Sequence, residues 1–132
     1  MNRSFPIALG MMLSTVAFAG EGVRLTREEL FEFLPGAKVV HVAKSTGSTR
    51  RWTNDPDGKL VAHSNNKMYG SIAGNKAASA PGTWSVSDDG KYCIAIEWGR
   101  VAENWCAAIV KDEAGAYYLN SVDPERKIEF TK

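Results

Sequence analysis

The feature that most restricts the fold of this chain is a repeated exchange between short alternating segments and turn sequences, which begins at Ala37. In the alternating segments, β-branched and aromatic residues take turns with polar ones, as in strands that bury one face. Turn sequences rich in Asp and Gly separate them at residues 55–58, 88–90, 99–100 and 112–115. We predict eight strands, over residues 38–43, 50–53, 59–63, 82–87, 91–98, 103–111, 116–121 and 127–131. The predicted class is therefore mainly β, an antiparallel meander forming a small barrel or a strongly bent sheet.

One short helix is predicted ahead of the strands. Thr26 and Glu29 have the spacing of a capping box, in which each side chain accepts a hydrogen bond from the backbone of the other residue. Pro35 and Gly36 end the helix, so it covers about residues 27–34. Because two turns are too few for a stable isolated helix, we expect its apolar residues to pack on the sheet.

Residues 1–19 have the order of a secretory signal peptide. Arg3 supplies a positive charge, an uncharged apolar stretch follows over residues 5–18, and small residues at Ala17 and Ala19 precede Gly20. We predict cleavage after Ala19, which leaves residues 20–132 as a single domain. The apolar stretch is shorter than the about 20 residues that a membrane span needs, so we expect no membrane span after signal cleavage.

Length and charge narrow the classes of partner. The chain has 132 residues, and removing the nineteen of the leader leaves 113, enough for one domain with a modest core. The sixteen Lys and Arg become fifteen when Arg3 is lost, equal to the fifteen Asp and Glu. A net charge of zero argues against nucleic acid as a partner. We expect an unknown protein or small ligand as partner, and a monomer or small homo-oligomer.

The two cysteines are predicted to form a disulfide. Export to an oxidising compartment favours a bridge over free thiols, whose alternative use would be as a catalytic nucleophile. A two-residue turn at residues 99–100 pairs Trp98 with Val101, and counting back places Cys93 opposite Cys106. The cysteines are then a non-hydrogen-bonded pair about 4.5 Å apart, a separation that a disulfide can bridge. The disulfide closes the loop from Cys93 to Cys106, and closing a loop of this length adds about 3 kcal/mol of stability.

The neighbouring turn sorts the side chains of three strands onto two faces. If residues 88–90 are a three-residue loop, Trp84 faces Ile94 and Val86 faces Tyr92. The predicted core face holds Trp84, Val86, Tyr92, Ile94, Ile96, Trp98, Val101 and Trp105. The less apolar face holds Ser85, Cys93, Ala95, Glu97, Asn104 and Cys106. This second face is either exposed to solvent or lines a polar lumen.

Motifs for catalysis, metals and phosphate are weak. Residues 70–76 resemble a phosphate-binding loop, but the spacing is one residue short and no Ser or Thr follows Lys76. His41 and His63 are the two histidines, and a metal site needs a third or fourth ligand that no motif supplies. We interpret them as ordinary strand residues. No nucleophile stands in a recognisable frame with a base, so we predict no catalytic residue, no metal and no cofactor.

Two loop regions are candidates for binding. Arg50, Arg51 and Trp52 follow a polar stretch, and Arg with Trp often anchors a binding surface. The alternative is a solvated hairpin loop with Trp52 in the core. The second candidate, Lys76, lies in a predicted loop over residues 65–81, and loops this long are either functional or disordered.

Three segments together resemble a known family. They are residues 81–98, which contain Gly-Thr-Trp and Cys93, residues 103–106, which end on Cys106, and Tyr117–Leu119. The combination, with the leader, the short helix and the Pro-Asp-Gly turn, resembles a family of small exported proteobacterial proteins described as a domain of unknown function, DUF995. The resemblance implies the β meander, the disulfide and a bacterial protein that is periplasmic or secreted. It implies no activity, because the family has no catalytic residues to carry over.

These observations predict an exported, non-enzymatic binding module whose ligand is unknown, acting as an inhibitor or as another binder of a protein partner. Two alternatives stay open. One is a small-ligand carrier with a lipocalin-like cavity, and the other is an enzyme of unfamiliar design.

Overall fold

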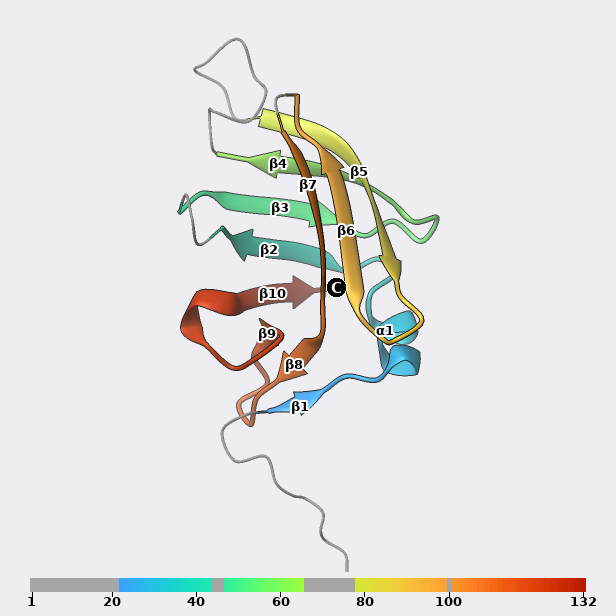
Figure 1. Ribbon diagram of the computed structural model, residues 1–132, viewed down its shortest axis with the longest axis vertical. Coiled ribbons are helices and arrows are strands. Elements are labelled where there is room, and N and C mark those ends of the chain that lie inside the picture. Colours follow the sequence, from blue (N-terminus) through green and yellow to red (C-terminus); the bar gives the residue numbers. More distant parts are fainter. Residues whose placement is uncertain (1–21, 44–46, 66–77, 100) are drawn as a thin grey trace, which may run out of the picture.

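A single curled antiparallel sheet of ten strands forms the body of the computed structural model, which describes residues 22–43, 47–65, 78–99 and 101–132 (Figure 1). The elements in chain order are β1 (Val23–Arg24), α1 (Arg27–Phe33), β2 (Lys38–Val42), β3 (Thr49–Thr53), β4 (Lys59–Ser64), β5 (Ala78–Val86), β6 (Tyr92–Glu97), β7 (Ala102–Ala107), β8 (Ile109–Lys111), β9 (Tyr117–Leu119), the 3₁₀-helix η2 (Pro124–Arg126) and β10 (Lys127–Thr131). The predicted class, a mainly β and strongly bent antiparallel sheet with one short helix, is confirmed. The capping box is present as well, with Thr26 and Glu29 bonded to each other's backbone.

The number of strands differs from the prediction for local reasons. β1 has only two residues, too few to show an alternating pattern. The predicted strand over residues 103–111 is divided at Ala108, whose N–H donates to Asn120 Oδ1 and whose carbonyl accepts from Asn120 N–H. β5 begins at Ala78, inside the predicted loop, because residues of low strand propensity there pair with β4.

The sheet curls into a half-barrel that is open on one side. The strand order is β1-β8-β9-β10-β2-β3-β4-β5-β6-β7, so β1 and β7 are its two edges. β6 and β7 lie in front of β2, β3 and β10, which form the opposite wall (Figure 1). The chain runs from the end of β7 directly into β8, and so crosses from one wall to the other without closing the barrel.

The predicted register of the central hairpins is confirmed. Cys93 pairs with Cys106 at a Cα–Cα distance of 4.0 Å, and the two are joined by a disulfide. Trp84 pairs with Ile94, and the second hairpin closes with a bond from Val101 N–H to the Trp98 carbonyl. The disulfide lies on the outer face, opposite to the core.

The inner face of the half-barrel is the core, with one correction. Five of the predicted core residues are buried, namely Trp84, Tyr92, Ile94, Ile96 and Trp98, whereas Val86 and Trp105 are partly buried and pack against the core. Val101 was placed in the core by alternation but is 46% exposed. It lies at the tip of the β6–β7 hairpin, before β7 begins. The opposite wall and α1 complete the core with Leu30, Leu34, Val39, Trp52, Leu60 and Ile128.

A buried chain of polar groups joins the two walls and the end of α1. Trp52 Nε1 donates to the Tyr92 hydroxyl at 2.9 Å, and that hydroxyl donates to Asn54 Oδ1 at 2.6 Å. Asn54 Nδ2 in turn donates to the carbonyl of Leu34, the C-cap of α1. Burial raises the pKa of Tyr92, so its hydroxyl stays protonated and keeps donating.

The disulfide predicts a measurable loss on removal. Replacing both cysteines, Cys93→Ser with Cys106→Ser, is expected to lower the free energy of unfolding by about 3 kcal/mol, because the loop closed across 13 positions no longer restrains the unfolded chain. Urea unfolding followed by tryptophan fluorescence measures this. Ser85→Ala, on the same outer face, is the control and should unfold like the parent protein. Equal stability of the double variant and the parent would contradict the prediction.

Candidate functional site

A buried ion pair spans the interior of the half-barrel. Arg50 is on β3 and Glu103 is on β7, so the pair joins opposite walls. Arg50 Nη1 donates to Glu103 Oε1 and Arg50 Nη2 donates to Glu103 Oε2, each at 2.6 Å. The side chain of Arg50 is 3% exposed and that of Glu103 is 15% exposed. Two charges with so little exposure must be well bonded to be tolerated.

Two indoles complete the coordination of the Glu103 carboxylate. Trp98 Nε1 donates to Oε1 at 3.0 Å, and Trp105 Nε1 donates to Oε2 at 2.7 Å. Burial alone would raise the pKa of Glu103, but the hydrogen bonds from Arg50 and Trp98 outweigh it, and the pKa lies below its usual value. The carboxylate therefore stays ionised and receives four hydrogen bonds.

His41 is the third member of this cluster. Its Nδ1 is 3.0 Å from Arg50 Nη2. Because a guanidinium can only donate, Nδ1 accepts and the ring proton is assigned to Nε2. Burial, with the nearby charge of Arg50, lowers the pKa of His41 from 6.5 to about 4. At neutral pH the ring is uncharged and offers one N–H donor.

A hollow of about 660 Å³ lies over this cluster, on the open side between the two walls. We call it the side hollow. Besides the ion pair, its lining includes His41, Ala43, Trp105, Leu119, Asn120 and Arg126. Its volume falls within the range of about 300–1,000 Å³ of small-molecule sites, which also combine apolar walls with a few polar groups. Because Arg50 and Glu103 cancel, Arg126 leaves the lining with one positive charge.

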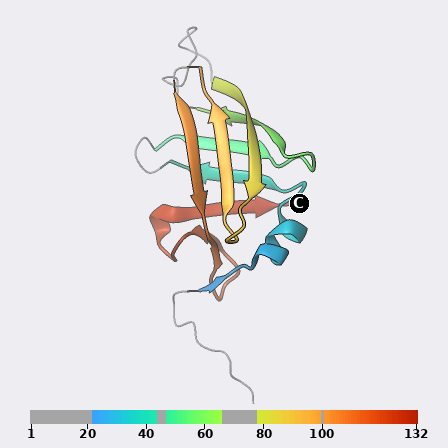
Figure 2. The ribbon, with the colours of Figure 1, turned by 45° about the vertical axis from the view of Figure 1, so that its right-hand side comes forward.

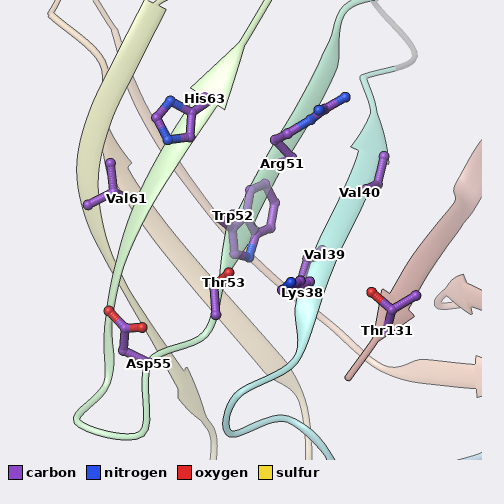
Figure 3. A pocket seen from close by; sticks show the side chains of 10 residues that line it. All are labelled: Lys38, Val39, Val40, Arg51, Trp52, Thr53, Asp55, Val61, His63 and Thr131. Atoms are coloured by element: carbon purple, nitrogen blue, oxygen red, sulfur yellow. The ribbon is translucent and has the colours of Figure 1, made fainter.

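A second hollow, of about 580 Å³, lies on the outer face of β2, β3 and β4 (Figure 3). Arg51, His63 and Lys38 contribute polar groups, and Val61 contributes apolar surface. Arg51 and His63 are opposite each other in the β3–β4 register. These side chains are exposed, so the groups here are held less firmly than those of the side hollow. The side hollow is the stronger candidate.

The alternation of β3 separates the residues predicted for binding. Arg50 points inside and pairs with Glu103, Arg51 lies on the outer face, and Trp52 is buried in the core at 3% exposure. The position of Trp52 agrees with the alternative of a solvated loop with Trp52 in the core, but the solvated loop does not include Arg50, which is buried within β3. The fourth candidate, Lys76, lies outside the described residues.

The sequence contained a signal for Glu103 that residue type alone did not raise. Glu103 is two positions before Trp105 in the predicted strand, so its side chain lies on the same face as Trp105, the core face. A carboxylate on a core face needs a buried partner. His41 gave no comparable signal, because its role depends on β3 and β7 being brought together by the curl of the sheet.

In the ranges that the structure describes, no three side chains of His, Cys, Asp and Glu come together as metal ligands would. Within the same ranges, no helix has the length and apolar content to cross a membrane.

Comparison with known proteins gives one match. The family model described as "Protein of unknown function (DUF995)" matches residues 11–114, well over half of the chain. No curated protein and no solved structure matches it.

The pKa of His41 predicts a loss of stability in mild acid. Below pH 6.5 the unfolded chain takes up a proton at this ring, whereas the folded protein does so only near pH 4. Stability therefore falls as the pH drops through this window, by about 2–3 kcal/mol at pH 4.5. Gln in the variant His41→Gln keeps an acceptor beside Arg50 and cannot titrate. Between pH 7 and pH 4.5 this variant should therefore lose about 2–3 kcal/mol less stability than the parent protein.

Urea unfolding at the two pH values measures this difference. The lowered pKa of Glu103 acts in the same direction and is shared by both proteins. His63→Gln, on the exposed outer face, makes the same replacement away from Arg50 and Glu103 and is the matched control. A parallel fall of the His41→Gln variant and the parent would contradict the assignment.

Proposed function

The chain belongs to the DUF995 family, and from the geometry of its open side we propose that it is a non-enzymatic binding module whose ligand occupies the side hollow. The observation that carries the proposal is the Arg50–Glu103 cluster beneath a hollow of about 660 Å³. The side chains of this floor are bonded to one another, and the charges of Arg50 and Glu103 cancel. The floor supports a ligand without having to rearrange, which lowers the cost of binding.

The same cluster favours binding over catalysis. A general acid or base works best with a pKa near the operating pH. Glu103 has a lowered pKa and receives four hydrogen bonds, and His41, with a pKa of about 4, already accepts from Arg50. Either group would have to break the ion-pair cluster to move a proton.

The lining indicates the chemistry of the ligand. Ala43, Leu119 and the Trp105 ring present apolar surface, while Arg126 and the His41 Nε2–H present positive potential and a donor. A ligand with an apolar body and a carboxylate or another negative group fits this combination. A protein partner can supply such a negative group. A module that binds a partner in this way can act as its inhibitor. The second candidate function, a small-ligand carrier, is favoured by the volume of the hollow.

Filling the hollow is expected to block binding. A panel of small aromatic carboxylates, titrated into the ¹⁵N-labelled protein, should shift the resonances of Trp105 and His41. Ala43→Phe places a ring in the hollow and should raise the dissociation constant of the carboxylates by about tenfold or more. Arg126→Gln removes the excess charge and should raise it by a smaller factor. Val61→Phe, on the outer face, is the control.

Two results would contradict this proposal. One is a set of shifts confined to the outer face of β2, β3 and β4. The other is unchanged affinity in both Ala43→Phe and Arg126→Gln, with circular dichroism showing that these variants fold.

We further propose that the module acts outside the cytoplasm, in the periplasm or secreted. The leader-like residues 1–19 and a disulfide on the outer face support this. Mass spectrometry of protein isolated from the producing cells' envelope or medium is expected to find a chain that starts at Gly20 and contains no free thiol. A chain retaining Met1 with both thiols reduced would contradict the proposal.

A further inference from the structure

β7 is the last strand in the order of the sheet and forms one of its edges. In the described part of the chain no strand lies on the side of β7 away from β6, and Figure 2 shows this edge at the margin of the front wall. β7 is six residues long, whereas β1 at the opposite edge has two. A long edge presents a row of backbone donors and acceptors to which another strand can pair.

The register identifies which backbone groups face outward. The bond from Val101 N–H to the Trp98 carbonyl marks a hydrogen-bonded pair, and such pairs alternate along an antiparallel ladder. The outward-facing residues of β7 are therefore Ala102, Asn104 and Cys106. The short Cα–Cα distance of 4.0 Å at the disulfide agrees, because non-hydrogen-bonded pairs are the closer ones.

The described part of this edge has little of the usual protection. Proteins shield exposed edges with lysines, prolines, bulges, very short strands or inward-pointing charges, and of these β7 has only an inward-pointing charge, that of Glu103, which Arg50 neutralises. The side chains of Ala102 and Asn104 are uncharged, and the charge of Glu103 points inside to Arg50. The edge is bounded at one end, where Asn120 occupies the N–H and the carbonyl of Ala108. Among the described residues, the stretch of this edge without a neighbouring strand thus covers residues 102–106.

The edge also borders the side hollow. Glu103, Trp105 and Cys106 of β7 contribute to its lining. Side chains of a paired strand alternate between the two faces of a sheet. A strand added to β7 would therefore direct every second side chain over the hollow, toward Leu119 and Arg126.

We propose that β7 pairs with an extended peptide segment of a partner protein, which carries an acidic and an apolar side chain two residues apart over the side hollow. This proposal rests on the proposed function and names the class of its ligand. Main-chain hydrogen bonds supply affinity and the hollow supplies selectivity, as in other cases of strand addition. The excess charge of Arg126 selects the acidic residue and the apolar wall at Leu119 selects the other.

Charge favours a different protein over a second copy of this chain. A copy pairing through its own β7 would offer Glu103 as that strand's single charged residue. That carboxylate is already held by Arg50 of its own chain. It is not free to meet Arg126.

The test begins with a library of displayed ten-residue peptides, threonine at alternate positions and random residues at the others. Selection on the intact, disulfide-bonded protein should enrich peptides with an acidic and an apolar residue two positions apart. An enriched peptide is then synthesised in two N-methylated forms, one for each alternate set of amides. Only the peptide that is methylated at the amides facing β7 should lose affinity, by about tenfold or more, because methylation removes the donors that would bond to β7.

Variants of the edge provide the second arm. Asn104→Pro removes an outward N–H and leaves the bonds to β6 in place, so peptide affinity should fall by about tenfold or more. Asn104→Ser keeps the N–H and is the matched control. Binding of aromatic carboxylates in the hollow should persist in Asn104→Pro, which separates this proposal from the proposed function.

Several outcomes would overturn the proposal. These are a library without enrichment, equal affinity of the two N-methylated forms, or equal peptide binding by Asn104→Pro and Asn104→Ser. A further one is a dimer in sedimentation that Asn104→Pro dissociates and the peptide does not displace, which would assign the edge to a second copy. The methylated peptides keep the test decisive even if Asn104→Pro does not fold.

Discussion

The open half-barrel depends on the ion pair between Arg50 and Glu103. These residues are 53 positions apart and stand on opposite walls, so their bonds set the separation of β3 and β7. Burying two charges costs several kcal/mol for each ion, and only complete hydrogen bonding offsets it. Trp98 and Trp105 complete the hydrogen bonding of the Glu103 carboxylate, and His41 accepts a hydrogen bond from the Arg50 guanidinium. Arg50 Nε, which is buried without a hydrogen-bond partner among the described residues, is the part of this cost that is not offset.

The way this cluster is bonded also determines what the site can do. A lone pair or proton of Arg50, Glu103 or His41 that bonds within the cluster cannot at the same time act on a substrate. His41 shows this most clearly, because Arg50 both occupies its Nδ1 and contributes to lowering its pKa to about 4. The ring is left as a neutral donor beside a hollow. In the binding function that we propose, such groups recognise a ligand by shape and by a few hydrogen bonds.

How much of this the sequence could reveal depends on how local each interaction is. The Cys93–Cys106 pairing followed from one turn, because a hairpin register is set by residues that are neighbours in the chain. The Arg50–Glu103 contact could not be obtained in this way, since it requires the curl of the five adjacent strands from β3 to β7. The break at Ala108 was equally hidden, because it depends on Asn120 from a later strand. Alternation alone could have placed Arg50 and Arg51 on opposite faces, but not what each would meet.

The unpaired edge and the hollow are two results of a single arrangement. The chain leaves β7 at Ala108 to enter the other wall, where Asn120 captures both of its backbone groups. The same crossing prevents β7 from pairing with the opposite wall, and the Arg50–Glu103 bridge holds the two at a distance that side chains do not fill. Both openings are therefore present before a ligand arrives. On our proposal neither wall has to move, so little of the interaction energy is lost to reorganisation, and a short strand with two suitable side chains uses the edge and the hollow together.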